Sequence, residues 1–428
     1  MSLYGKLCID KKVSEKEEKN NISKWVHIPD ELLELIMKRL CLMDYLALRT
    51  ICTPWRSTVT KAMANKHCCP LSELPLIVLL SDEEVLFSLR TEREHCPKVS
   101  IFESRKITCY GSVEGWMIMC DYVKKNSLSI FFKNPVTNSR VSISSPLDYP
   151  SNSPIQGKKL CLSKMVASSG PDCYKSNDFL AALFNDFLHI AFYSLFDKSW
   201  NMIKPDQDSG VAFLDIEIMG SKLYVRTSKP LNSIIVYDLK DFSSGSSPKT
   251  KVLAMLPQRS TPHVPRIIDN QHHVSGCAFC SLAKHETLDQ LFLIYMICNI
   301  TYRSADVGYL NMPKEYVIPP EITGVEVFKI DINKEPIKWI KCERLDDDVI
   351  FVSGVKSMVM SRTSLNCPQA LIRENNVYFA LSFKCPSDPW QGNLLGIKHL
   401  TDSSIKYFSI EKSNHSKVLY PFWFIPSI

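Results

Sequence analysis

The chain has 428 residues, of which 45% are hydrophobic and 22% are charged, so intrinsic disorder over most of its length is excluded. Its 51 Lys and Arg outnumber its 45 Asp and Glu, giving a net charge of +6. This small excess is spread along the sequence, which argues against a nucleic-acid-binding protein. The longest apolar run, 291–300, is shorter than the ~18 residues of a membrane span, so no membrane association is expected.

Residues 1–23 are polar and rich in Lys and Glu, and they are predicted to form a disordered tail. This stretch has no apolar core of the kind that a signal peptide requires. The 16 cysteines are therefore expected to be reduced thiols in a cytoplasmic and/or nuclear protein.

Residues 24–66, the helical module, are predicted to form about three short helices. Pro29 suits the first turn of a helix, where its missing N–H costs nothing. Asp30 and Glu31 place negative charge at the N-terminus of that helix, where the helix dipole favours it. Its apolar residues recur with helical spacing and form one broad stripe: Leu32, Leu33, Ile36 and Leu40.

Two more helices are predicted in the same module. Asp44 suits the N-cap of a second helix that carries Leu48, and Pro54 begins a third that carries Trp55. A module of ~40 residues rarely buries all of its apolar surface alone. The stripe is therefore expected to contact another protein; the alternative is that it packs on the rest of this chain.

Residues 75–428 are predicted to form an all-β domain, because short runs of Val, Ile, Phe and Tyr alternate there with turn residues. Four hairpins are expected, in which residues 127–132 pair with 140–143, 222–227 with 233–239, 325–332 with 337–343, and 376–383 with 394–400. Sheet units that recur every 40–50 residues or so favour a β-propeller of about six or seven blades. The alternative is a pair of β-sandwiches or another all-β fold. Residues 150–176 and 243–275 are expected to be long loops.

Three motifs could carry chemistry, and each has a simpler structural interpretation. Ser112 lies one position too early for the nucleophile elbow, and no helix pattern follows it. The segment from His272 to Cys280 offers Cys277 and Cys280, but no second pair of ligands is nearby, and on a strand these two cysteines point to opposite faces. The three aspartates 346–348 suit a solvated turn. No catalytic residue, metal or cofactor is therefore predicted.

The helical module resembles an F-box. The resemblance is carried by residues 25–33 and continues through Ile36, Leu40, Asp44 and Leu48 to Trp55. The remainder is similar to the plant F-box family whose C-terminal region is called domain of unknown function 295, or the KIB-type β-propeller. The stretches that carry this second resemblance are 86–89, 111–116 with 134–137, 327–331 through Trp339 to 351–352, and 421–428.

This resemblance implies a non-catalytic substrate-recognition subunit of an SCF-type (Skp1–cullin–F-box) ubiquitin ligase. The F-box would dock on a Skp1-like adaptor, and through it on a cullin, while the propeller would bind an unknown target protein. The residues expected to contact the adaptor or to frame its binding surface are Pro29, Leu32, Leu33, Ile36, Leu40, Leu48 and Trp55. The loops at 150–176, 257–276 and 304–322 are candidates for the substrate surface.

Two alternatives to the ligase function stay open at this point. In the first, the chain binds a Skp1-like subunit as a scaffold without delivering any protein for degradation. In the second, it is a propeller enzyme with a cluster of His and carboxylate groups at the mouth of the central channel.

Overall fold

The computed structural model divides the chain into two compact units, which are described separately: residues 1–73 with residue 428, and residues 74–427. The described residues are 28–40, 44, 47–65, 74–80, 84–89, 93–95, 107–124, 127–143, 162–173, 175, 178–204, 209–244, 250–257, 266–267, 272–303, 318–365, 372–384, 391–402, 404–408 and 419–426. The tail predicted at 1–23 lies outside them.

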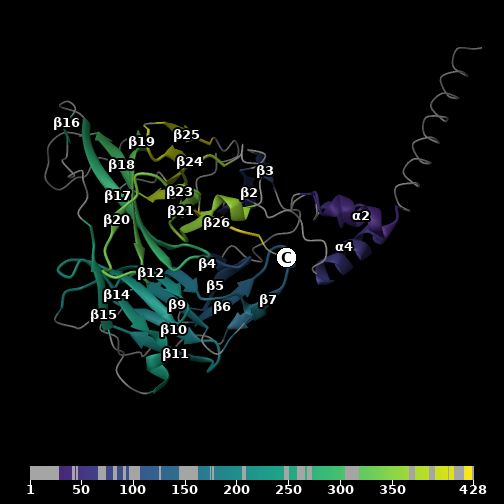
Figure 1. The fold of residues 1–428 in the computed structure, drawn as a ribbon, viewed down its shortest axis with the longest axis horizontal. Coiled ribbons are helices and arrows are strands. Elements are labelled where there is room, and N and C mark those ends of the chain that lie inside the picture. The colour runs from purple at the N-terminus through teal and green to yellow at the C-terminus, as the bar shows by residue number, and fades with distance from the viewer. Residues whose placement is uncertain are drawn as a thin grey trace, which may run out of the picture. The chain divides into compact units, whose positions relative to one another are not determined.

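The first unit contains two helices with defined bounds, α2 (Asp30–Met37) and α4 (Thr53–Asn65) (Figure 1). Pro29 immediately precedes α2, and its carbonyl accepts hydrogen bonds from the N–H groups of Leu32 and Leu33. Thr58 of α4 donates its hydroxyl to Asp30 at 2.7 Å and so joins the two helices. The prediction of three helices has only loose support: Asp44, Ala47 and Leu48 are helical, but the bounds of a helix there lie outside the described residues.

The second unit is a β-propeller of six blades, each a separate sheet of four or five strands (Figure 1). Blade 1 contains β1 (Leu76–Leu80), β2 (Glu84–Ser88), β3 (Arg93–His95) and β26 (Leu419–Phe424), and blade 2 contains β4 (Ile107–Val113), β5 (Trp116–Lys124), β6 (Ser127–Lys133) and β7 (Arg140–Ile143). Blade 3 contains β8 (Leu162–Ala167), β9 (Phe179–Phe184), β10 (Ile190–Ser194) and β11 (Ser199–Ile203), and blade 4 contains β12 (Phe213–Met219), β13 (Lys222–Thr227), β14 (Ser233–Asp238) and β15 (Thr250–Met255).

The last two blades have five strands each. Blade 5 contains β16 (Arg266–Ile267), β17 (His272–Lys284), β18 (Gln290–Arg303), β19 (Ile318–Asp331) and β20 (Ile340–Lys341), and blade 6 contains β21 (Asp348–Ser353), β22 (Met358–Ser361), β23 (Asn376–Lys384), β24 (Gln391–His399) and β25 (Ile405–Tyr407). Short 3-10 helices occupy Pro171–Cys173, Leu239–Ser244 and Arg362–Leu365.

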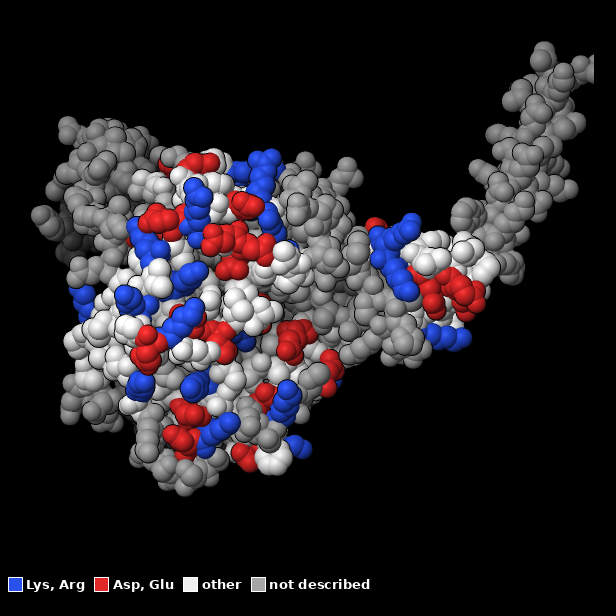
Figure 2. All heavy atoms as spheres, in the orientation of Figure 1, with Lys and Arg blue, Asp and Glu red and all other residues white. Residues whose placement is uncertain are grey.

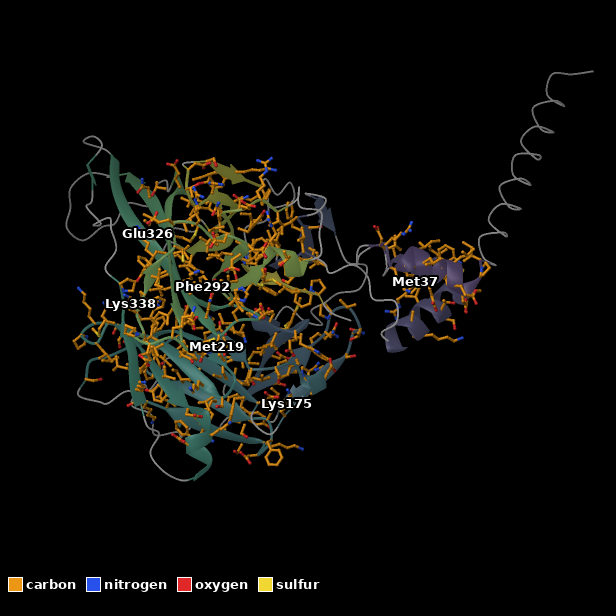
Figure 3. All side chains as sticks on the ribbon, in the orientation of Figure 1. Met37, Lys175, Met219, Phe292, Glu326 and Lys338 are labelled. Atoms are coloured by element: carbon orange, nitrogen blue, oxygen red, sulfur yellow. The ribbon has the colours of Figure 1, made fainter. Side chains whose placement is uncertain are left out.

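All four expected hairpins are present, as the pairs β6–β7, β13–β14, β19–β20 and β23–β24. The apolar residues of their strands fill clusters between neighbouring blades, such as the one around Phe292 of β18 (Figure 3). Acidic residues at strand ends shape the turns: Asp238 accepts a hydrogen bond from the N–H of Lys240, and Asp331 accepts one from the N–H of Asn333. Apolar runs that are buried between blades, together with turn chemistry, therefore explain why these segments are antiparallel pairs.

The expectation that residues 150–176 and 243–275 are loops is wrong in part. Leu162–Ala167 forms β8, and Thr250–Met255 forms β15, while β16 and the start of β17 also fall within 243–275. The polar composition of these segments concealed the strands. Lys164, for example, is only 5% exposed because it is paired with a buried carboxylate.

The ring of blades is closed by a strand from the end of the domain. β26 pairs antiparallel with β1, so blade 1 is built from both ends of the propeller sequence. Trp423 of β26 is fully buried, and its indole N–H donates to the carbonyl of Val352 in blade 6 at 2.8 Å. On the other side, Ser112 of blade 2 lies 3.4 Å from the carbonyl of Trp423 and donates to it. This strand therefore joins three blades.

Blade 6 departs from the simple up-and-down order of the other blades. Its strand order is β22-β21-β23-β24-β25, and β21 runs parallel to β23 while it pairs antiparallel with β22. A parallel neighbour needs a crossover, and the chain makes it through the 3-10 helix Arg362–Leu365 and the residues that follow.

Blade 5 is longer than the other blades. Strands β17, β18 and β19 have 13, 14 and 14 residues, and Figure 1 shows β17 and β18 running together to β16 at their far end. The position of this extra length follows from a contact with blade 4. The N–H of Leu282 in β17 donates a hydrogen bond to Asp215 in β12, and β12 begins only two residues before Asp215, at Phe213. Residues 272–279 of β17 therefore extend beyond the start of β12.

The amino face is the end of the blades at which β8 and β12 begin. The arm is the part of blade 5 that extends beyond that face: Arg266–Ile267 of β16 and residues 272–279, 296–303 and 318–325 of the three long strands.

Among the described residues, no helix is long and apolar enough to cross a membrane.

Candidate functional site

The helical module has a small core of its own. Leu33 and Met37 of α2 are buried against Val59 and Ala62 of α4, together with Leu48. Ile28, Leu40 and Trp55 are half-buried around this cluster. The internal packing of the two helices therefore uses one side of α2.

Other apolar side chains of α2 remain exposed. Leu32 is 50% exposed, Leu35 56% and Ile36 37%, and their i, i+3, i+4 spacing places them side by side on one helix face. These three residues are called the apolar patch. Ile51, between the helices, is 58% exposed. Exposed apolar residues that cluster in this way are typical of a protein interface.

The seven residues predicted to contact or frame an adaptor surface therefore divide into groups. Leu32 and Ile36 belong to the apolar patch, and Pro29 is exposed beside it. The other four belong to the core of the helical module or line it: Leu33, Leu40, Leu48 and Trp55. The predicted adaptor surface includes neither Leu35 nor Ile51, although both are exposed. The helical spacing of Leu35 from Leu32 could have identified the first.

In the propeller, the most unusual cluster of side chains is a group of buried charges on the inner strands, here called the inner charge cluster. Lys164 of β8 donates to Asp215 of β12 at 2.8 Å, and both side chains are under 10% exposed. Lys284 at the end of β17 donates to the carbonyl of Ile218. Lys356 lies 3.6 Å from Glu286. Contacts of this kind join blades 3, 4, 5 and 6.

Glu217 is the least exposed carboxyl group of this cluster, at 1%. One of its oxygens accepts the N–H of Ile218, and the other is a buried atom without a hydrogen-bond partner. Burial raises the pKa of Glu217, because removal from water penalises the charged form more than Lys164, Lys284 and Lys356 favour it. For Glu286, burial also acts upward, but Lys356 and Lys284 outweigh it and the pKa is lowered.

The motifs weighed for chemistry have structural positions. Ser112 lies in β4 and donates to a backbone carbonyl of β26, so no strand–turn–helix elbow surrounds it. The backbone of Cys277 and Cys280 belongs to β17, where residues three apart point to opposite faces. Among the described residues, no group of three or more His, Cys, Asp or Glu could hold a metal ion.

Asp346 and Asp347 lie in the turn before β21, and Asp348 is the first residue of that strand. Asp347 accepts hydrogen bonds from the hydroxyls of Ser361 and Thr363, and these bonds lower its pKa. Asp348 pairs with the buried His285 at 3.1 Å. Asp347 and Asp348 thus stabilise the turn through different partners.

The candidate substrate loops at 150–176, 257–276 and 304–322 lie partly outside the described residues. Their described parts include β8, β16 and the amino-face ends of β17 and β19. On the face of the molecule seen in Figure 2, acidic and basic side chains are interspersed, and neither sign forms a large field.

Comparison with known families identifies both units. The family model described as KIB1-4 beta-propeller matches residues 86–409, and the model described as F-box domain matches residues 25–66. The curated proteins searched include no match to this chain.

Solved structures offer only weak similarity. A prolyl endopeptidase matches with 9% identity over 74% of this chain and 35% of its own, at a TM-score of 0.27, so this chain spans about a third of that enzyme. The catalytic domain of a GH62 alpha-L-arabinofuranosidase from Coprinopsis cinerea matches with 9% identity over 77% of this chain and 93% of its own, at 0.29. AofleA from Arthrobotrys oligospora matches with 12% identity over 75% and 89%, at 0.28.

These structural similarities carry no functional argument, since their TM-scores are below 0.5. The family matches are different, because together they extend over most of the sequence and correspond to the two units of the structure. The chain belongs to the KIB1-4 beta-propeller family and carries an F-box domain ahead of its propeller.

Proposed function

We propose that this chain is the substrate-recognition subunit of an SCF-type ubiquitin ligase. Its F-box domain docks on a Skp1-like adaptor, and through it on a cullin, while the propeller binds a target protein. An F-box followed by a propeller fits a substrate-recognition protein, and F-box domains generally bind Skp1-like adaptors.

The observation that carries this proposal is the apolar patch. Leu33 and Met37 already fill the contact between α2 and α4, so Leu32, Leu35 and Ile36 are not needed for the internal packing of the helical module. Fully burying an exposed side chain of this size contributes about 1.5–3 kcal/mol, and these three, which are 37–56% exposed, have about half of that to gain against a partner. Three such side chains at the centre of an interface supply a usual set of binding hot spots.

The chain acts by proximity in this proposal. Binding an adaptor at one end and a target at the other raises the effective concentration of the target near a ubiquitin-charged enzyme. No bond-making group of the chain itself is required, and no cofactor. Within the inner charge cluster, Lys164 and Asp215 have a structural use, because their contacts join neighbouring blades.

The test of the docking surface is the double variant L32E/I36E, measured against a purified Skp1-like adaptor by calorimetry. Both side chains are exposed, so the module is expected to stay folded while adaptor binding weakens by about 2 kcal/mol or more, the loss typical of hot-spot residues. The matched control is F196E/L288E, which places the same charges on exposed apolar residues of the propeller. Equal adaptor binding by wild type and L32E/I36E would refute the docking surface.

A reconstituted ligase separates delivery for ubiquitination from a scaffold role. With the cullin and a ubiquitin-charged enzyme present, a protein held by the propeller is expected to be ubiquitinated with wild type and not with L32E/I36E. If adaptor binding is normal and the bound protein stays unmodified, the chain is a scaffold and the ligase proposal is wrong.

A further inference from the structure

The inner charge cluster contains more hydrogen-bond donors than its own acceptors engage. The ammonium group of Lys164 is well supplied, because it donates to Asp215 at 2.8 Å and to the carbonyl of Leu282 at 3.4 Å. Lys284 has one described acceptor, the carbonyl of Ile218 at 3.2 Å, although an ammonium group carries three N–H donors. Donors are therefore left over at the end of β17.

Lys356, in the turn between β21 and β22, is the least satisfied of the three lysines. Its side chain is only 8% exposed, and its ion-pair partner, Glu286 Oε1, is 3.6 Å away. This distance exceeds that of an ordinary hydrogen bond, and no described residue accepts a hydrogen bond from Lys356. Glu286 Oε1 is likewise a buried atom without a hydrogen-bond partner. A buried ammonium group in this state has lost its water without replacing it, which is costly.

Glu217 is a second buried group with unused hydrogen-bonding capacity. The residue is 1% exposed, and its Oε2 atom has no hydrogen-bond partner. Burial raises its pKa, so this carboxyl group favours the protonated form, in which it donates a hydrogen bond. Glu217 then contributes a donor to the cluster without contributing a negative charge.

The charges of this part of the cluster do not balance. Lys164 and Asp215 neutralise each other. Glu286 offsets one of the two remaining ammonium groups, those of Lys284 and Lys356, and the other is left without a negative partner. Both lysines lower the pKa of Glu286 in spite of its burial, so a negative charge is stabilised at this place. An unbalanced ammonium group beside unused donors favours an anionic ligand.

These groups come from three blades, and solvent reaches them from one end. Glu217 and Lys284 lie near the ends of β12 and β17, away from the amino face, and Lys356 approaches them from the turn before β22. Met219, two residues beyond Glu217 on β12, marks this region in Figure 3. Lys284 is half-buried and the side chain of Glu286 is 25% exposed, so the entrance lies beside these two residues.

We propose that the inner charge cluster binds a small oxyanion, a phosphate or a carboxylate, through the ammonium groups of Lys284 and Lys356 and the carboxyl group of Glu217. An oxyanion supplies the acceptor atoms that these donors lack and the negative charge that balances the extra ammonium group. It also connects blades 4, 5 and 6, from which the three side chains come. A metal ion does not suit the cluster, because no group of three or more His, Cys, Asp or Glu among the described residues could hold one.

The test is isothermal titration calorimetry of the full chain with inorganic phosphate and, separately, with acetate, at an ionic strength kept constant with chloride. Wild type is expected to bind at least one of the two at a single site. Lys356→Gln removes an ammonium group and is expected to weaken this binding about tenfold or more, as the loss of a charge-assisted hydrogen bond does. Glu286→Gln removes the carboxylate that competes for Lys356 and is expected to tighten the binding about threefold or more.

The matched control is K338Q, which removes the same charge at an exposed position of blade 5, apart from Met219 in Figure 3. It should bind the oxyanion within about twofold of wild type. Circular dichroism checks that each variant is folded, and K284Q, with the same expected loss, replaces K356Q if that variant does not fold. The proposal is overturned if wild type binds neither oxyanion, if K356Q binds as tightly as wild type, if K338Q loses as much affinity as K356Q, or if E286Q binds more weakly than wild type.

Discussion

Lys164 and Glu217 show how far a residue's environment can depart from its usual one. Both belong to residue types that are almost never fully buried unless paired, and both lie on innermost strands with 5% and 1% exposure. Lys164 is accommodated by Asp215, which also accepts the N–H groups of Ile216 and Leu282. A polar residue in a sequence is expected to be exposed. Lys164 is buried instead because Asp215, on the next blade, pairs with it.

Gly111 provides a test at the scale of one atom. A Cβ at this position in β4 would clash with the carbonyl oxygen of Met165 in β8, and a backbone atom cannot move aside cheaply. Gly111→Ala is expected to lower the free energy of unfolding by at least about 1–3 kcal/mol, the usual cost of overpacking. Urea unfolding measures the change.

Gly354→Ala is the control for that experiment, because a Cβ there meets no atom within 4 Å. It is expected to leave the stability unchanged or to raise it by about 0.4–1 kcal/mol. Equal losses for the two variants would mean that the contact between β4 and β8 is not the cause.

Glu217 provides a test in pH. Because burial raises its pKa in the folded state, the folded chain keeps this proton at pH values where the unfolded chain, with a carboxyl pKa near 4.5, has lost it. The contribution of Glu217 to stability therefore falls as the pH rises above about 4.5. Glu217→Gln removes this dependence.

The measurement is urea unfolding of wild type and E217Q at a series of pH values. The free energy of unfolding of wild type minus that of E217Q should decrease as the pH rises. The exposed Glu335, changed to Gln, is the control. A difference for E217Q that stays constant or grows with pH contradicts the raised pKa.

At the scale of elements, the sequence predicts strands that are short apolar runs between turn residues, and it misses strands whose polar residues are buried. The hairpin β13–β14 was predictable because apolar residues such as Leu223, Val225 and Ile235 lie on both sides of the turn at 229–232. β8 was not predictable, because its Ser and Lys residues are typical of a loop. The order β22-β21-β23 was beyond prediction as well, since periodicity identifies a strand without naming its neighbours.

The same limit applies to α2. Its apolar residues predict an amphipathic helix with one broad stripe, but they do not divide that stripe between a core and a patch. That division depends on α4, whose Val59 and Ala62 cover Leu33 and Met37 and leave Leu32 and Ile36 exposed. The F-box match covers the segment in which the site residues are predicted, and the side chains that are exposed there differ in part from the predicted set.

Strand β26 gives the prediction that belongs to this scale. Trp423→Ala removes a fully buried side chain and the hydrogen bond to Val352, and it is expected to cost about 3–5 kcal/mol of unfolding free energy. Trp423→Phe keeps most of the packing and loses the hydrogen bond, so its cost should be clearly smaller. Thermal unfolding, followed by the circular dichroism of the backbone so that the signal does not depend on Trp423, compares the two variants with wild type. Equal costs would show that packing at this position contributes little.

At the scale of the whole molecule, the two units have different kinds of surface. The helical module is small and carries its apolar patch on a short helix, whereas the propeller is a closed ring with one long blade. Six blades could be counted only once β26 was seen to pair with β1, because blade 1 is divided between the two ends of the propeller sequence. A repeat count along the chain alone leaves that blade incomplete.

Because β26 pairs with β1, blade 1 can be completed only near the end of translation. β1 leaves the ribosome early, yet the strand that completes its sheet is translated more than three hundred residues later, at Leu419–Phe424. Until then blade 1 has an uncovered edge beside its neighbours, which is a hazard for mispairing with other nascent chains. A frameshift or stop codon anywhere before Leu419 would therefore leave the circle open, however intact the preceding blades.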